Sequence, residues 1–553
     1  MIAALLFRFI VVTCLAATQS NAPLPSNPSS GFGIAGTIVD ADTGAAIAHA
    51  RVAASAYSHR DQYIAVSTGE DGQFAFTNLS PDKYTLRAEA RGYFTQSFNQ
   101  HNFSETAVVV GPNHDSGNIV FALARESSIR GAVIDEAGDA VPDAAVFLYQ
   151  TGTNSGSRRT SLLQQLVAND DGSYAFPHLL AGRYFVAVSA RPWYAQQHPL
   201  PSSQVASRGE PQFPGQNSGS RSEQQLSSLT NVAYRVTFYP GVTQPEDAAP
   251  IDLDPGDQFV ANISLQPVPA IRFRLDSNSG SPIYSVELES RAFDGGIPVF
   301  TKAMPGPTGA VEILGVAPGH YSVQFSHTNR ENSRVISSRE IEVSGTGQVQ
   351  PASKTQSASV GVIVRHEPGT TLPQEGFLRF RNIATDLDLP EKLAITGRLA
   401  SKHNLPPAIY EVSFENTAGV YVKTVSAAGA TVNGRTVQIT GTSPVQLVLI
   451  LAQASANVTG VALRNSQPVA GAMIVLVPAD PSQNHSLFRM YETDSDGTFS
   501  LRDVASGEYT LLALAKGWDL EWQNPTALKP YLVRGQAVQV HENRTYQFKV
   551  QVQ

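Results

Sequence analysis

Three short acidic turns bring carboxylate side chains close together in the chain. They are residues 70–72 (Glu-Asp-Gly), 170–172 (Asp-Asp-Gly) and 494–497 (Asp-Ser-Asp-Gly). Clustered carboxylates can bind calcium, but an EF-hand loop also needs a Glu at its twelfth position, and counting from Asp494 that position is Ala505. Asp and Gly are also the residues that a tight hairpin turn requires. We therefore predict hairpin turns without a metal, and calcium binding stays open as the alternative.

The histidines do not have the spacing of a catalytic zinc site. None of the 12 His residues is followed by Glu three positions later, and His-Glu-x-x-His is absent. A Gly-Lys-Ser/Thr phosphate loop and a Gly-x-Ser-x-Gly nucleophile turn are absent too. Residues 31–36 match Gly-x-Gly-x-x-Gly, but they lead into a predicted strand where a dinucleotide site needs a helix. The sequence therefore predicts a protein that is not an enzyme and has no cofactor.

Aromatic residues recur just beyond one strand of the repeats described below. Trp193 and Tyr194 hold this place in the second repeat, Trp518 and Trp522 in the last, and Tyr93 in the first. Exposed aromatic faces stack on sugar rings or bind protein partners, which makes these residues the candidate ligand-binding set. Because the place recurs with the repeat, we favour the interpretation that the rings cover the end of a β-sandwich as part of the fold. Carbohydrate binding through them is the alternative.

Size and composition favour several small β domains. A chain of 553 residues suggests roughly three to five domains. Charged residues make up only 16% of the chain, and 43 Gly and 35 Pro residues are typical of strands joined by many turns. The net charge of −8 and the lack of a basic run argue against a nucleic-acid partner. Cys14 is the only cysteine, so no disulfide within the chain is expected.

The first 22 residues have the pattern of a secretory signal peptide. An apolar run over residues 9–17 is followed by small and polar residues and then by Pro-rich coil over residues 23–30. The run is too short for a stable membrane anchor, and no later segment is apolar over the ~18 residues that a membrane helix needs. We predict that residues 1–22 are cleaved and that the mature chain is exported to the periplasm, the cell surface or the extracellular space.

One pattern occurs three times along the chain. Residues 36–86, 131–186 and 460–511 each begin with a Gly-led strand, continue through Asp-Gly-x-Phe/Tyr and end in a strand that contains a Tyr. Self-similarity on this scale, with short strands of alternating polarity and frequent turns, indicates an all-β tandem array of about five sandwiches. The predicted domains are 31–125, 126–268 with a disordered insertion near 196–229, degenerate copies at 269–350 and 355–453, and 455–553.

The repeated motifs resemble those of the carboxypeptidase regulatory-like domain. The shared features are Gly-x-Val/Ile-x-Asp, an Ala-rich second strand, Asp-Gly-x-Tyr/Phe-x-Phe and Pro/Ala-Gly-x-Tyr, and they are clear in the first, second and last repeats. The resemblance implies seven-stranded prealbumin-like or Ig-like sandwiches of a secreted bacterial type, in a fold group that includes carbohydrate-binding domains. Such a resemblance is informative about fold and nearly silent about function.

The sequence thus favours an exported binding or structural protein without catalytic machinery. Carbohydrate is the leading ligand class by resemblance, so polysaccharide or cell-envelope components are the first partners to expect. The alternative is a scaffold or adhesin that docks proteins and binds no glycan. An enzyme or enzyme accessory protein is the third hypothesis, and an enzyme would need acidic residues and His gathered between domains.

Overall fold

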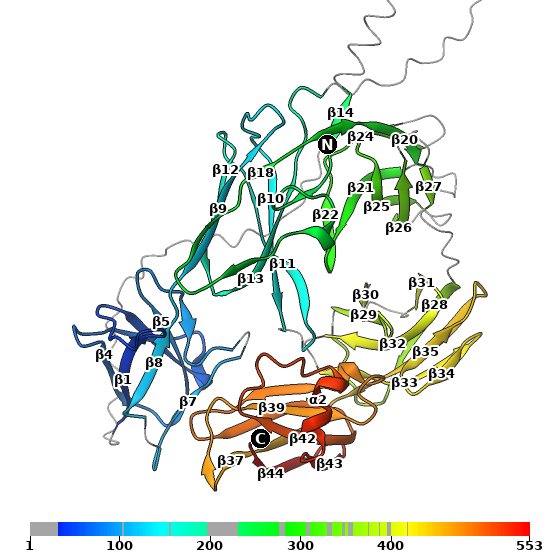
Figure 1. Ribbon diagram of the computed structural model, residues 1–553. Coiled ribbons are helices and arrows are strands. Elements are labelled where there is room, and N and C mark those ends of the chain that lie inside the picture. Colours follow the sequence, from blue (N-terminus) through cyan, green and yellow to red (C-terminus); the bar gives the residue numbers. More distant parts are fainter. Residues whose placement is uncertain are drawn as a thin grey trace, which may run out of the picture.

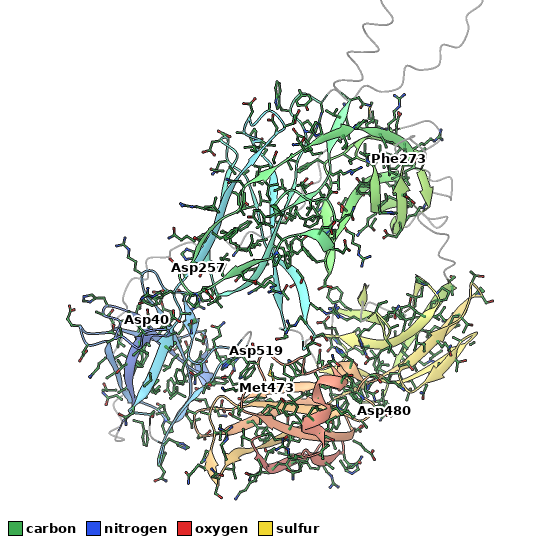
Figure 2. All side chains as sticks on the ribbon, in the orientation of Figure 1. Asp40, Asp257, Phe273, Met473, Asp480 and Asp519 are labelled. Carbon is green, nitrogen blue, oxygen red and sulfur yellow. The ribbon has the colours of Figure 1, made fainter. Side chains whose placement is uncertain are left out.

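The computed structural model is built from paired β-sheets, which confirms the predicted all-β tandem array of sandwiches. The predicted signal peptide and the predicted insertion near 196–229 lie outside the described residues. Each sandwich buries an apolar core between its two sheets. Figure 2 shows the side chains on the ribbon. The structure describes residues 31–101, 104–114, 116–153, 156–195, 231–275, 283–305, 310–328, 334–344, 349–351, 358–373, 375–385, 388–394, 400–416 and 419–553.

The first sandwich covers residues 32–123. One sheet has the order β4-β1-β8, and the other has the order β3-β2-β5-β6 with β7 also paired to β5. Their facing sides bury a core that includes Ile38, Phe76 and Phe121. The strands are β1 (Phe32–Asp40), β2 (Arg51–Ala56), β3 (Ile64–Ser67), β4 (Gln73–Leu79), β5 (Asp82–Glu89), β6 (Gln96–Ser97), β7 (Val108–Val110) and β8 (Ile119–Leu123).

The second sandwich covers residues 127–264. Its sheets have the orders β12-β9-β17, with β18 also on β9, and β11-β10-β13-β15, with β16 also on β13. A short β14-β19 ladder follows toward the third sandwich. The strands are β9 (Ser127–Ile134), β10 (Ala145–Gly152), β11 (Arg159–Val167), β12 (Ser173–Leu179), β13 (Gly182–Ser189), β14 (Val232–Tyr234), β15 (Thr237–Phe238), β16 (Ile251–Leu253), β17 (Gln258–Val260), β18 (Ile263–Ser264) and β19 (Pro267–Pro269).

The third sandwich, residues 271–351, pairs the sheets β20-β24-β23 and β22-β21-β25-β26-β27. It shares an apolar interface with the second sandwich, in which Phe147 and Phe238 pack near Ala292 and Ile297. The strands are β20 (Ile271–Leu275), β21 (Ile283–Ala292), β22 (Gly295–Pro298), β23 (Lys302–Pro305), β24 (Val311–Val316), β25 (Gly319–Thr328), β26 (Arg334–Val343) and β27 (Val349–Pro351).

The fourth sandwich, residues 358–453, pairs the sheets β31-β28-β36-β33 and β30-β29-β32-β35-β34. The apolar run at 445–451 lies in the central strand β36, where Leu447 and Leu449 are fully buried. The strands are β28 (Ala358–His366), β29 (Glu375–Asn382), β30 (Asp388–Ala394), β31 (Ala400–Leu405), β32 (Ala408–Glu415), β33 (Val420–Ala428), β34 (Thr431–Asn433), β35 (Thr436–Ile439) and β36 (Val445–Gln453).

The fifth sandwich, residues 456–551, pairs the sheets β38-β37-β41, with β44 also on β37, and β40-β39-β42-β43. A short helix lies between β42 and β43. The elements are β37 (Ala456–Arg464), β38 (Gln467–Pro468), β39 (Met473–Pro478), the 3-10 turn η4 (His485–Leu487), β40 (Arg489–Glu492), β41 (Thr498–Val504), β42 (Gly507–Leu514), α2 (Pro525–Leu532), β43 (Gln536–Val540) and β44 (Thr545–Gln551).

A buried tyrosine explains the last motif of the repeat. In each of the five sandwiches its hydroxyl donates a hydrogen bond to the backbone carbonyl four residues earlier, which ties the strand to the preceding turn. The third and fourth sandwiches keep this bond although their other motifs are weak. The pairs are Tyr84 to Ser80 (3.0 Å), Tyr184 to Leu180 (2.8 Å), Tyr321 to Ala317 (2.7 Å), Tyr410 to Pro406 (3.0 Å) and Tyr509 to Ala505 (2.9 Å).

The opening glycine of the repeat is explained by the close approach of a parallel strand. A Cβ atom at Gly36, Gly131 or Gly460 would lie 2.2, 2.0 or 2.1 Å from a carbonyl oxygen of the neighbouring chain segment. Real Cβ atoms do not come so close to backbone, so any side chain here would push the parallel strand away. The first motif of the repeat is therefore a packing requirement of the sandwich.

The chain returns to its start. Although they are the sequence ends of the array, the first sandwich (blue) and the fifth (orange and red) lie side by side, with the second and third above them (Figure 1). Hydrogen bonds join them, including one from Ser495 N to Ala107 O at 2.8 Å. The five sandwiches thus form a closed arrangement and not an extended string.

Candidate functional site

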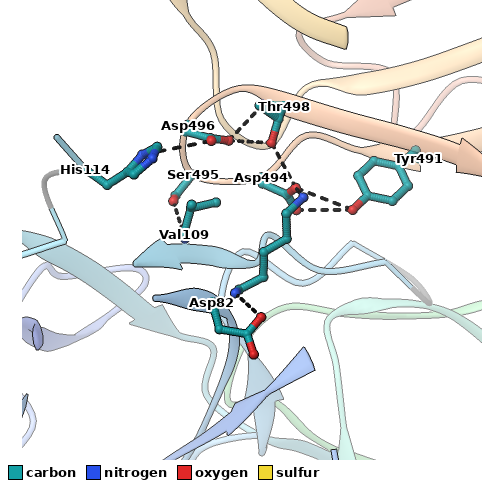
Figure 3. A network of polar contacts seen from close by, with 9 residues as sticks. Asp82, Val109, His114, Tyr491, Asp494, Ser495, Asp496 and Thr498 are labelled. Carbon is teal, nitrogen blue, oxygen red and sulfur yellow. Dashed lines mark hydrogen bonds and ion pairs between the residues drawn. The ribbon is translucent and has the colours of Figure 1, made fainter. Parts of the chain in front are cut away.

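The acidic turn of the fifth sandwich lies against β5 and β7 of the first (Figure 3). The Asp494 side chain is only 1% exposed and forms an ion pair with the ammonium group of Lys83. The same carboxylate accepts hydrogen bonds from the Tyr491 hydroxyl (3.3 Å) and the Thr498 hydroxyl (3.2 Å). Burial raises the pKa of Asp494, and the bond from Lys83 opposes that shift.

The rest of this turn pairs with the edge of the first sandwich in the manner of a short strand. Ser495 N donates to Ala107 O (2.8 Å), and Val109 N donates to the Ser495 hydroxyl (2.8 Å). Asp496 caps its own turn by accepting from Thr498 N (3.0 Å), and its carboxylate lies 4.0 Å from the His114 ring. The turn therefore satisfies backbone groups at the edge strand β7.

A second buried carboxylate lies beside this turn. The Glu492 side chain is 1% exposed and accepts hydrogen bonds from the Thr106 hydroxyl (2.5 Å) and from His101 Nδ1 (3.3 Å) of the first sandwich. Burial raises the pKa of Glu492, while the bonds from His101 and Thr106 lower it. Both buried acids of the fifth sandwich thus find their partners in the first.

Three sandwiches meet at Trp518. Its ring stacks on His101 of the first sandwich, with centroids 4.5 Å apart and planes 8° from parallel. Its indole N–H donates to Gly471 O within the fifth sandwich (3.2 Å). Its backbone carbonyl accepts from the Thr153 hydroxyl (3.0 Å), which lies between β10 and β11 of the second sandwich. One face of this candidate ligand-binding ring is therefore covered by another domain.

Trp522 is buried in an apolar layer of the fifth sandwich that is separate from the core between its two sheets. It is 8% exposed and packs edge-to-face on Phe488, with centroids 6.0 Å apart, in a cluster that includes Leu528 of α2. Trp518 packs at the margin of the same cluster. The structure thus brings these two candidate residues together, but as parts of a packed apolar layer.

Trp193 has the opposite environment, because it is 80% exposed. It meets Tyr194 edge-to-face at 5.7 Å, and the Tyr194 hydroxyl bonds to Glu136. In the first sandwich the Tyr93 hydroxyl bonds to Asp40 at 2.9 Å. Tyr93 and Tyr194 therefore hold equivalent structural places, and Trp193 is the candidate with a freely exposed ring.

The two other acidic turns are exposed and hold no partner from another domain in the described contacts. Asp71 accepts from Gln73 N (3.1 Å), and Asp171 accepts from Ser173 N (2.9 Å), so each acid caps its own turn. Among the described residues, no group of three or more His, Cys, Asp or Glu is arranged to hold a metal ion. Turn formation accounts for these carboxylates.

Acidic residues and His do gather between domains, as an enzyme would require, so access decides what they can do. Glu492 and Asp494 are each 1% exposed. Glu492 is bonded to His101 and Thr106 of the first sandwich, and Asp494 to Lys83 of the first sandwich and to Tyr491 and Thr498 of its own. A nucleophilic serine would need a hydrogen bond to a histidine base, and in the described part of the chain no hydrogen bond joins Ser495 to the nearby His114. The arrangement is suited to holding domains together.

The sequence did not identify Lys83, His101 and Thr106, which complete this interface. They carry no motif of their own. The usable signal was a departure from the repeat, because the fifth turn has Asp494 and Ser495 where the first has Gly69 and Glu70. The fifth turn thus has an uncharged Ser495 in place of the exposed Glu70 and an acid, Asp494, in place of Gly69, and this combination is suited to burial.

The family model of the carboxypeptidase regulatory-like domain matches residues 33–123 and 128–207. Residues 33–123 and 128–207 therefore carry domains of the carboxypeptidase regulatory-like family, as the motifs of the first two repeats predicted. No curated protein sequence matches the chain. Among the described residues, no helix has both the length and the apolar character to cross a bilayer.

Three similar solved structures are distant from this chain in sequence. The TIE protein of Bacillus anthracis is 9% identical over 96% of this chain and 75% of its own, with a TM-score of 0.16. GBS52, a minor pilin of Streptococcus agalactiae, is 12% identical over 43% of this chain and 97% of its own (TM-score 0.20). Two B repeat units of the collagen-binding protein of Staphylococcus aureus are 9% identical over 88% and 93% (TM-score 0.14). At these TM-scores the likeness does not bear on function.

Proposed function

We propose that this chain is an exported, non-catalytic scaffold or adhesin that presents its sandwich surfaces to protein partners at the cell envelope or outside the cell. The supporting observation is the three-domain contact at Trp518, beside which the two buried acids Glu492 and Asp494 of the fifth sandwich bond to the first. When the sandwiches are held in place before binding, less conformational entropy is lost on association with a partner. The apolar run in residues 9–17, typical of a signal peptide, supports export.

Cross-linking in producing cells tests this proposal. We expect the chain in the exported fraction, in adducts with envelope proteins whose pattern changes in Trp518→Ala, because that variant frees the first sandwich from the fifth. Trp193→Ala is the matched control and keeps the wild-type adducts. Retention of the chain in the cytoplasm, or identical adducts in wild type and Trp518→Ala, contradicts the proposal.

Carbohydrate binding is the second candidate, and the exposure of Trp193 favours it. This ring is 80% exposed beside Tyr194, whereas Trp518 and Trp522 are stacked or buried. A glycan array and pull-downs on insoluble polysaccharides provide the test. Specific binding that is lost in Trp193→Ala but kept in Trp522→Ala would assign a glycan site to the second sandwich. Failure of the wild-type chain to bind any glycan leaves the protein-docking role.

A further inference from the structure

A cavity of about 310 Å³ lies between the fourth and fifth sandwiches. Strands β29 and β32 line it from the fourth sandwich, and η4 with the start of β40 lines it from the fifth. Four arginines and two glutamates contribute to its walls, which is an excess of two positive charges. The acids are Glu411 and Glu415, and the arginines are Arg379, Arg381, Arg435 and Arg489.

Both carboxylate oxygens of Glu411, the buried acid of this cavity, already accept hydrogen bonds. Glu411 is 1% exposed, and its Oε2 accepts from the Arg381 guanidinium at 2.9 Å and from His485 N at 3.2 Å. Its Oε1 accepts from Ser486 N (2.9 Å) and from the Ser486 hydroxyl (2.7 Å). Glu411 thus joins the two sandwiches, and neither of its oxygens forms a direct pair with the remaining arginines.

At the mouth of the cavity, Arg379 and Glu415 pair with each other. The guanidinium Nε of Arg379 lies 2.6 Å from Glu415, and both side chains are partly exposed. This pair is neutral in sum. The excess positive charge therefore comes from Arg435 and Arg489.

In the described contacts, Arg435 and Arg489 donate hydrogen bonds to neutral groups alone. Arg435 is 7% exposed, and its guanidinium donates to the Asn484 side chain (2.6 Å). Within the described residues, the Nε of Arg435 has no hydrogen-bond partner. Arg489 donates to the backbone carbonyls of Phe488 (2.9 Å) and Ser486 (3.1 Å). Burial lowers the pKa of both guanidinium groups, and the charges of Glu411 on Arg435 and of Asp503 on Arg489 oppose that shift.

We propose that this cavity binds a small ligand through a carboxylate, sulfate or phosphate group, held by Arg435 and Arg489. A guanidinium fork matches the geometry of such oxyanions, and within the described residues the buried Arg435 has no acid in direct contact, which is costly for a cation. The cavity volume of about 310 Å³ is at the small end of ligand pockets, so it suits a free anion or a single acidic sugar. This site is separate from the interface that carries the proposed scaffold function.

Titration calorimetry on the full chain tests the site. The probes are sulfate, phosphate, acetate and glucuronate, each at one total ionic strength set with sodium chloride. We expect saturable binding of at least one probe to the wild-type chain, weakened at least about tenfold in Arg435→Gln because a charged hydrogen-bond donor is lost. Arg183→Gln is the matched control, since Arg183 is an exposed arginine paired with Asp252 in the second sandwich, and it binds as wild type does.

The relative affinities identify the source of the anion. Tighter binding of glucuronate than acetate indicates an acidic sugar, and tighter binding of sulfate or phosphate indicates a free inorganic anion. If none of the four probes binds saturably to the wild-type chain, or if Arg435→Gln binds them unchanged, the proposal is wrong.

A second variant covers the case in which Arg435→Gln does not fold, as judged by circular dichroism. Arg435→Lys keeps the positive charge but lacks the guanidinium fork. We expect it to fold and to bind the preferred probe at least about tenfold more weakly than the wild-type chain. Wild-type affinity in Arg435→Lys would show that the fork of Arg435 does not hold the ligand.

Discussion

Residues 169–172 of the second sandwich and 494–497 of the fifth form the same hairpin turn, with Asp then Gly at the last two positions. In the second sandwich, Asn169, Asp170 and Asp171 are all exposed. In the fifth sandwich the corresponding turn begins with the fully buried Asp494. The two turns share the Asp and Gly that shape the hairpin. They differ at their first two positions, which are Asn169 and Asp170 in one and Asp494 and Ser495 in the other.

The tryptophans of the same two sandwiches repeat this difference. Trp193 follows β13 of the second sandwich and is 80% exposed. Trp518 follows β42 of the fifth and is stacked on His101 of the first sandwich. A motif shared by the repeats therefore specifies the sandwich, and the neighbour that docks on it decides the role of the outer residues. The fifth sandwich is specialised for contact with the first.

Trp518→Ala is expected to have the largest effect on this comparison. The change removes the stack on His101 and part of an apolar layer, so we expect a loss of about 2–4 kcal/mol in the free energy of unfolding of the fifth sandwich. Urea unfolding followed by the fluorescence of Trp522 measures the loss. Small-angle X-ray scattering should also show a larger radius of gyration, because the first sandwich is released.

Trp193→Ala is the counterpart in the second sandwich. An exposed ring contributes little to folding, so we expect a change below about 0.5 kcal/mol and an unchanged radius of gyration. Equal destabilisation by the two substitutions would show that the exposure of these rings does not separate their roles.

Asp494→Ala is expected to have the next largest effect. It removes the buried partner of Lys83 and leaves the hydroxyl of Tyr491 without its acceptor, which should cost about 1–3 kcal/mol. The Thr498 hydroxyl keeps its hydrogen bond to Asp496 (2.6 Å). The lower part of the range reflects the partial exposure of Lys83, whose ammonium can regain water. The measurements are urea unfolding and scattering, as for the tryptophans.

Asp171→Ala provides the matched change in an exposed turn. It removes one cap to Ser173 N and no contact with another domain, so we expect a loss of about 1 kcal/mol or less and no change in scattering. A larger radius of gyration in Asp171→Ala, or an unchanged one in Asp494→Ala, would contradict the assignment of the contact with the first sandwich to the turn at residues 494–497.

Docking of the first sandwich on the fifth should depend on pH. Burial raises the pKa of Glu492 and of Asp494 above their ordinary values, so protonation favours the docked state. The stabilising contribution is full below about pH 4, the ordinary carboxyl range, and is lost as the pH rises through the raised pKa values. We therefore expect tighter docking at about pH 5 than at about pH 8.

Several neighbours act on these two acids, and the control must separate them. Glu492 faces His101, Thr106 and Glu105, while Asp494 faces Lys83, Thr498 and Asp496, and also the Tyr491 hydroxyl. Glu492→Gln mimics the protonated acid, so its radius of gyration should vary less between pH 5 and pH 8 than that of the wild-type chain. A wild-type chain that opens on mild acidification would reverse the expected sign.

Asp40 acts in the opposite direction and limits the useful pH range. The Arg125 guanidinium and backbone amides hold the pKa of Asp40 well below its usual range. Its contribution to the first sandwich is therefore present above about pH 4 and declines only at lower pH. Measurements between pH 5 and pH 8 leave this contribution constant.

The sandwich fold was predictable because its determinants are local and repeated. Gly36 and its equivalents are required by a parallel strand, and Tyr84 and its equivalents by a bond four residues back. Such requirements recur at a fixed spacing, so one sequence displays them several times. The closed arrangement had no such signal, because Lys83 and Asp494 are 411 residues apart and each contact occurs once.

The sequence showed that aromatic residues recur after equivalent strands, but it did not show which of the rings would be buried and which exposed. Trp193, Trp518 and Trp522 follow equivalent strands, and nothing in the sequence near them states which will be covered. Trp518 is covered by a histidine from the first sandwich, and Trp522 by the α2 segment that has no counterpart in the motif. The arginines of the cavity were missed for the same reason, since Arg435 and Arg489 belong to different sandwiches and meet only in three dimensions.

Arg183→Gln is expected to have the smallest effect, and it tests whether burial or charge pairing makes the first–fifth contact strong. Arg183 and Asp252 form a two-bond ion pair at 2.7 and 3.0 Å, but their side chains are 53% and 61% exposed. Water and salt screen such a pair, so we expect a loss below about 0.5 kcal/mol. Lys83→Gln, whose partner is buried, should cost more and should expand the particle in scattering. If the two substitutions cost the same, the contact between the first and fifth sandwiches would owe its strength to the stack at Trp518 and not to its charges.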